Sequence, residues 1–139
     1  MGSVRKQAVF GGVDGLTMVM AIVTGLLIAR QPGSAAWHAA FGGAGGELVG
    51  MSAGQYLSDR EAGLKVALTV GVAGGSACVL PAIPFALLPR FPAACAAVVT
   101  VLVLAGVIAW LRPEHGLQAV LRTYGILLAA GLLSGLTGL

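Results

Sequence analysis

Residues 93–111 have the sequence AACAAVVTVLVLAGVIAWL, which contains no charged side chain and decides the class of fold. An α-helix needs about 20 predominantly apolar residues to cross the hydrocarbon core of a membrane, so this stretch is long enough to span one. Of the 139 residues in the chain, 58% are hydrophobic, 22 are glycine and only 9% are charged. Because a soluble domain carries about 25% charged residues, the composition predicts an integral membrane protein.

Four further apolar segments accompany this one, and we predict five transmembrane helices in a single transmembrane domain covering residues 1–139. The predicted helices cover residues 8–29, 35–58, 66–88, 93–111 and 119–139. The breaks between them hold proline, glycine and charged residues, which are typical of turns. The second helix is the most polar, because it contains His38, Glu47 and Gln55.

The lysine and arginine residues are distributed unequally between the two sides of this arrangement. Two lie on one side, at Arg30 and Arg90. The other side has six, at Arg5, Lys6, Arg60, Lys65, Arg112 and Arg122. Cytoplasmic loops carry the excess of positive charge, so the N-terminus is expected in the cytoplasm. The alanine- and glycine-rich composition favours a bacterial source, and therefore a multi-pass protein of the plasma membrane.

Several classes of function are disfavoured. The net charge of +3 comes from scattered residues, so a nucleic-acid partner is not expected. Cys78 and Cys95 both lie in apolar runs, where they are typical of small core residues. The sequence contains no zinc-ligand spacing, phosphate-binding loop or nucleophile–base arrangement. We therefore expect neither an enzyme nor a permanently bound cofactor, and membrane lipid as the surroundings.

Two acidic residues lie inside predicted helices, Asp14 in the first and Glu47 in the second. A charged side chain at membrane depth costs about 2.5–3.5 kcal/mol on insertion scales and usually faces a cavity or a partner. Neither acid has a lysine or arginine in a neighbouring turn, so both are candidate proton carriers or cation ligands. The alternative is that each is protonated and hydrogen-bonds to a neighbouring helix.

The second helix carries two stripes at four-residue spacing. One is a glycine ridge that favours close helix packing, formed by Gly42, Gly46, Gly50 and Gly54. Beside it lie Glu47, Met51 and Gln55, followed by Ser58. A carboxylate, a thioether and an amide oxygen on one face can bind a cation, and the thioether favours a transition metal. The alternative is that Met51 fills a gap in the core.

The first and third helices add related features. Gly11 and Gly15 form a further packing pair in the first helix, where Asp14 shares a face with Thr17 and Met18. If the first two helices pack together, Asp14 and Glu47 line one polar seam. In the third helix, Pro81 and Pro84 each remove a backbone hydrogen bond, so a kink or break is expected there.

Three motifs resemble those of the vacuolar iron transporter family, which carries iron and manganese. They are Val9-Phe-Gly-Gly-Val-Asp-Gly-Leu16, Met51-Ser-Ala-Gly-Gln-Tyr-Leu-Ser58 and Leu80-Pro-Ala-Ile-Pro-Phe85. The resemblance implies a homodimer of five-helix subunits in which Fe²⁺ or Mn²⁺ crosses near the dimer axis in exchange for protons. It places Asp14 and Met51 on the transport path, and Glu47 at a position where relatives carry a small or an acidic residue.

Two departures from the family pattern alter this expectation. The family inserts a glutamate-rich cytoplasmic domain between the second and third helices, whereas this chain has only Asp59-Arg-Glu-Ala-Gly-Leu-Lys65 there. The glutamate of the second motif is replaced by Gln55. The chain is therefore expected to carry another divalent ion, to bind its metal more weakly, or to depend on a partner protein that delivers the metal.

Two other functions remain open at this stage. A small proton-coupled efflux protein also uses a membrane carboxylate, but typically has four helices and an aromatic-rich cavity, whereas only 6% of this chain is aromatic. A membrane scaffold or accessory subunit would use the glycine ridges for packing alone. Its expected signature is the absence of metal binding.

Overall fold

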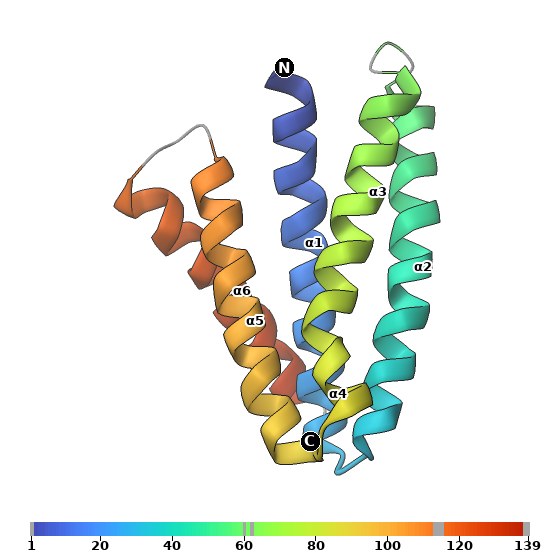
Figure 1. The fold of residues 1–139 in the computed structure, drawn as a ribbon. Coiled ribbons are helices and arrows are strands. Elements are labelled where there is room, and N and C mark those ends of the chain that lie inside the picture. The colour runs from blue at the N-terminus through green and yellow to red at the C-terminus, as the bar shows by residue number, and fades with distance from the viewer. Residues whose placement is uncertain (1, 60, 62, 113–115, 138–139) are drawn as a thin grey trace.

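The computed structural model describes residues 2–59, 61, 63–112 and 116–137, and these residues form an all-helical bundle. The long helices are α1 (Gly2–Ile28), α2 (Gly33–Ser58), α3 (Gly63–Val79), α5 (Arg90–Leu111) and α6 (Leu117–Thr137). A 3₁₀ turn η1 (Leu80–Ala82) and the short helix α4 (Ile83–Leu87) follow α3. The helices run alternately up and down, and the two chain ends lie at opposite ends of the bundle (Figure 1).

Four helical stretches of the described chain are long and apolar enough to cross a membrane. They are Val4–Ile28, Gly63–Leu87, Arg90–Leu111 and Leu117–Leu136. These four stretches confirm the prediction of an all-α membrane protein, by the length and composition of the helices. With 26 residues, α2 is longer than every helix except α1 but falls outside this set, so its crossing stays a prediction. Arg60 and residues 138–139, which entered the sequence predictions, lie outside the described residues.

The prolines interrupt the third predicted helix, as expected. Regular α-helix ends at Val79, and Pro81 lies within η1. Pro84 then occupies the first turn of α4, where a missing amide hydrogen costs little. The side chain of Phe85 is 4% exposed and packs with Ala36, Ala93 and Ala97 at this end of the bundle.

Helix α1 is the central element, because it packs against α2, α3, α5 and α6. Leu16 and Val19 of α1 are completely buried in the core, which all five long helices help to form. By contrast, α6 contacts mainly α1 and α5 and keeps many of its leucines on the outside. Such an apolar exterior suits a helix that faces lipid.

Two arginines join α1 to α5 at opposite ends of the bundle. Near the start of α1, the Arg5 guanidinium donates to the backbone carbonyls of Trp110 (3.1 Å) and Leu111 (2.5 Å) at the end of α5. At the other end, the Arg90 guanidinium donates to the Leu27 carbonyl near the end of α1. Both guanidinium groups donate to carbonyls in the last turn of a helix, where a positive charge is favourable.

The connection from α1 to α2 is a Schellman turn. The Gln31 amide donates to the Leu26 carbonyl at 2.9 Å, and the Arg30 amide donates to the Leu27 carbonyl at 3.2 Å. Arg30 has a φ of 54°, in the left-handed region that glycine usually occupies. Pro32 then precedes the first residue of α2. This tight turn places α2 antiparallel to α1.

Candidate functional site

Asp14 lies near the middle of α1, on a side of that helix that the rest of the chain leaves exposed. Its neighbours Gly11 and Gly15 are buried, because they face α3. The glycines on one side of the helix therefore bring α1 against α3, and the carboxyl group projects from another side. The hydroxyl of Thr17, one turn on, donates to the Val13 carbonyl of its own helix.

Glu47 lies in the middle of α2 and is only 8% exposed. Its carboxyl group lies against Gly74 of α3, where a Cβ atom would be 3.4 Å from the Glu47 Cδ and would overlap Oε2. Within the described residues, Oε2 has no hydrogen-bond partner. The glycine at position 74 thus provides the space that this buried carboxyl group occupies. A buried polar atom without a partner is unusual in a folded protein, so this carboxyl group is the one in the α1–α2–α3 region that most needs an explanation.

The two carboxyl groups face each other across the contact between α1 and α2. Asp14 and Glu47 interact electrostatically, and one turn away Met18 of α1 packs against Gly43 of α2. The structure therefore brings the two acids to the same level of the bundle, as the predicted polar seam requires. Asp14 is at the exposed side of this pair and Glu47 at the buried side.

Cys78 is a third polar group beside this pair. It is completely buried on α3, one turn beyond Gly74, and it interacts electrostatically with Glu47. Its thiol donates to the Ala40 carbonyl of α2 at 3.5 Å. The sequence alone predicts Cys78 only as a small core residue, and no motif points to Gly74. The one available signal was the four-residue spacing of these two positions, which places them on the same face of α3.

The remaining predicted ligands lie further along α2. Met51 and Gln55 are half-buried, and Ser58 is exposed at the end of the helix, where its hydroxyl donates to the Gln55 carbonyl at 3.3 Å. In the described part of the chain, no three His, Cys, Asp or Glu side chains are grouped so that they could hold a metal ion. Two of the predicted ligands are a thioether and an amide, so the grouping of Met51 and Gln55 with the two acids stays a prediction.

The glycines of α1 pack as expected, but with a different partner from the one considered. A Cβ atom at Gly11 would be 3.0 Å from the Val70 carbonyl carbon, and one at Gly15 would overlap the Gly74 carbonyl oxygen. These close contacts are made with α3, so within the described chain Gly11 and Gly15 do not face the glycines of α2. The α1–α2 contact is made instead by Met18 against Gly43.

The glycine ridge of α2 has no packing partner within the described chain. A Cβ atom built at any of its four members would meet no atom within 4 Å, which applies to Gly42, Gly46, Gly50 and Gly54. Its role in helix packing is therefore not fulfilled inside one chain, and packing against another chain stays a prediction. Within the chain, α2 uses a different face, where Ala44, Leu48 and Ser52 meet Gly71 and Gly75 of α3.

Comparison with known proteins returns no relative: no family model, no curated protein and no solved structure matches the chain. The resemblance to the vacuolar iron transporter family therefore depends on the three sequence motifs. Two of those motifs lie on the two helices that carry the acid pair, with Asp14 in α1 and Met51 in α2.

Proposed function

We propose that the protein exchanges a divalent transition metal, Fe²⁺ or Mn²⁺, for protons along a path between α1 and α2. The observation that supports this proposal is the pair formed by Asp14 and Glu47, two interacting carboxyl groups near the middle of facing helices. Two carboxylates in one site repel each other, so either a bound cation or a bound proton relieves the repulsion. Because the metal ion and the proton compete for the same carboxylate oxygens, the movement of one is coupled to the movement of the other.

The proposal includes α2 as a fifth transmembrane helix. Glu47 of α2 is level with Asp14 of α1, and α1 is long and apolar enough to cross a membrane. Helix α2 also runs beside α3 over most of its length, and the chain ends lie at opposite ends of the bundle (Figure 1). An odd number of crossings fits both features. The distribution of lysine and arginine then favours a cytoplasmic N-terminus.

A homodimer is part of the same proposal. One chain gathers too few carboxylate, thiol or imidazole groups for a metal ion among its described residues, while Asp14 and the glycine ridge of α2 remain open. A second copy against this side would add a second Asp14 and Glu47. Met51 and Gln55 lie in the same stripe of α2 as Glu47. Met51 would supply a soft thioether ligand and Gln55 a neutral amide ligand along the path. The family resemblance implies the same assembly.

Uptake into proteoliposomes tests the proposal. Wild-type protein is expected to take up Fe²⁺ or Mn²⁺ in a manner that depends on a pH gradient, and Asp14→Asn and Glu47→Gln are expected to abolish this flux. Both substitutions preserve the side-chain shape and remove a titratable oxygen. Glu61→Gln, at an exposed acid in the α2–α3 connection, is the matched control and should transport normally. Equal flux in wild type and Asp14→Asn would exclude Asp14 from the path.

A scaffold or accessory role is the second candidate, and one observation favours it. The glycine ridge of α2 has no packing partner within the described chain and so offers a face for a helix of another protein. This role predicts no metal binding by calorimetry on purified protein. Metal binding that is lost in Asp14→Asn would reject it. Restoring the family residue with Gln55→Glu should then tighten the apparent affinity for metal.

A further inference from the structure

Two adjoining apolar hollows lie along the outer face of α3, and the one nearer Lys65 is lined by α3 residues alone. Two hollows of about 490 and 610 Å³ share the side chains of Val72 and Ser76. The first lies between α3 and the neighbouring part of α2, where Phe41 and Leu48 form its other wall. The second follows α3 to Lys65. We refer to the part of this surface from Lys65 to Ser76 as the α3 groove.

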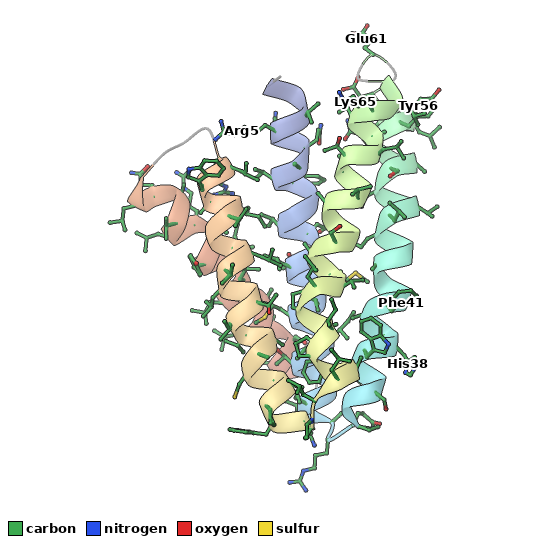
Figure 2. All side chains as sticks on the ribbon, viewed as in Figure 1. Arg5, His38, Phe41, Tyr56, Glu61 and Lys65 are labelled. Atoms are coloured by element: carbon green, nitrogen blue, oxygen red, sulfur yellow. The ribbon has the colours of Figure 1, made fainter. Side chains whose placement is uncertain are left out.

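The α3 groove combines an apolar floor with a positive charge at one end. Leu68 and Val72 are both about half exposed along it, at 45% and 53%. Lys65 lines the groove at the end of the bundle that also holds the start of α1, while Glu61 lies further out at the tip of the connecting loop (Figure 2). An occupant that suits this surface has an anionic group at Lys65 and an apolar chain beyond it.

The length of the α3 groove matches one leaflet of a bilayer. Eleven residues separate Lys65 from Ser76, a rise of about 17 Å in an α-helix. Half of the hydrocarbon core of a membrane is about 15 Å thick. The stretch Gly63–Leu87 that carries the groove is one of the four segments apolar enough to cross a membrane. An acyl chain that starts at Lys65 would therefore end near the membrane midplane, close to Ser76.

We propose that the α3 groove binds an anionic glycerophospholipid, with its phosphate beside Lys65 and an acyl chain along Leu68 and Val72. One such molecule supplies both the negative charge and the apolar chain, whereas a second protein helix would have to provide an acid at this one level. Lys65 also lies on the side predicted to be cytoplasmic, where anionic lipids attract basic residues close to the membrane. The proposal does not depend on the transport function.

Native mass spectrometry of the full chain, released from detergent with added phosphatidylglycerol or phosphatidylcholine, tests this proposal. Lys65→Gln is expected to lower phosphatidylglycerol occupancy about fivefold, the effect of losing roughly one cation near an anionic headgroup. Phosphatidylcholine occupancy should stay the same. Ser76→Phe fills the apolar end and should lower the occupancy of both lipids. Lys6→Gln and Leu132→Phe, at exposed positions on α1 and α6, are the matched controls and should behave like wild type.

Two results would overturn the proposal. One is an equal loss of phosphatidylglycerol in Lys65→Gln and Lys6→Gln, which would show attraction to positive charge in general. The other is a change of oligomeric mass in Ser76→Phe without any change in bound lipid, which would show that a second copy fills the groove. Lys65→Gln changes only an exposed side chain, so it keeps the test decisive if Ser76→Phe does not fold.

Discussion

Helix α1 packs in two different ways on its two sides. Toward α3, the contact is between backbones: a Cβ atom at Gly15 would overlap the Gly74 carbonyl oxygen and lie 3.0 Å from the Gly74 Cα. Toward α5 and α6, side chains fill the space, such as that of Ile108 against Gly12 and that of Met20 against Gly131. A flexible side chain can move when a neighbour changes, whereas a helix backbone cannot.

The two acids within the bundle and the buried cysteine all lie on one of these two sides of α1. Asp14, Glu47 and Cys78 all belong to the α1–α2–α3 side, where Gly74 leaves room for the Glu47 carboxyl group. Close backbone packing fixes the distance between helices and so fixes the relative positions of the side chains they carry. The helical residues of α5 and α6 include hydroxyl groups, such as the buried Thr123, but no acid. Side-chain hydrogen bonds join this side to α1, as from Ser134 to the Ala21 carbonyl. This side can therefore adjust without moving the acids.

Gly15→Ala should have the largest effect on stability, because it changes the backbone contact between α1 and α3. The added methyl group would overlap a backbone oxygen of α3, so we expect a loss of about 3 kcal/mol in the free energy of unfolding, at the upper end of overpacking costs. Gly125→Ala in α6 is the matched control, because nothing lies within 4 Å of its Cβ position. That change should be neutral or stabilise by up to about 1 kcal/mol. Thermal unfolding in detergent measures both, and equal effects would mean that the two sides of α1 pack alike.

Removing the hydrogen bonds of Arg5 and Arg90 tests how strongly these two arginines hold α5 against α1. Arg5→Met or Arg90→Met leaves carbonyls at the ends of α5 or α1 without their charged donor, and each should lower the free energy of unfolding by about 1–2 kcal/mol. Lys6→Met removes a neighbouring exposed charge and should have little effect. If Lys6→Met costs as much as Arg5→Met, the loss reflects overall charge and not the helix ends.

The sequence predicted the helices well because membrane helices depend on long apolar runs, which are local. Four predicted helices match segments apolar enough to cross a membrane, and the proline break falls at Pro81 as expected. The two acids were identified from the sequence because charge at membrane depth is rare. Their facing positions were only a possibility, since relative depth depends on the turn at Arg30.

The helix partners could not be predicted, because glycine spacing shows that a helix can be approached closely but not by which neighbour. The most regular glycine ridge, on α2, has no partner in the described part of the chain, whereas the less regular Gly71 and Gly74 of α3 make the close contacts. Arg5 and Arg90 were counted only as charges. Their hydrogen bonds to distant helix ends depend on which helices lie side by side, and this information is not local.

Tyr124→Phe tests the α5–α6 side, where side chains make the contacts, with a smaller expected loss of stability. The Tyr124 hydroxyl of α6 donates to the Leu102 carbonyl of α5 at 2.8 Å. Losing this bond should cost about 0.6 kcal/mol, the average for hydrogen bonds between membrane helices. Tyr56→Phe, at an exposed tyrosine near the end of α2, is the control and should leave thermal unfolding unchanged. A larger loss, comparable with that of Gly15→Ala, would show that the α5–α6 side is as rigid as the α3 side.

A small gain in stability, where the other changes give losses, is expected at the turn between α1 and α2 that sets the level of the two acids. Arg30 holds a left-handed φ of 54° without being glycine, a strain of about 1 kcal/mol or more. Arg30→Gly relieves this strain but also gives the unfolded chain more freedom, so the net gain should stay below ~1 kcal/mol. Gly63→Ala is the reciprocal change, at a φ of 75° in the next connection, and should destabilise the protein. Because glycine adopts a left-handed φ readily, Arg30→Gly should keep this turn and the level of Asp14 and Glu47, and thermal unfolding in detergent measures the gain. A clear loss of stability in Arg30→Gly would show that the Arg30 side chain itself stabilises the turn.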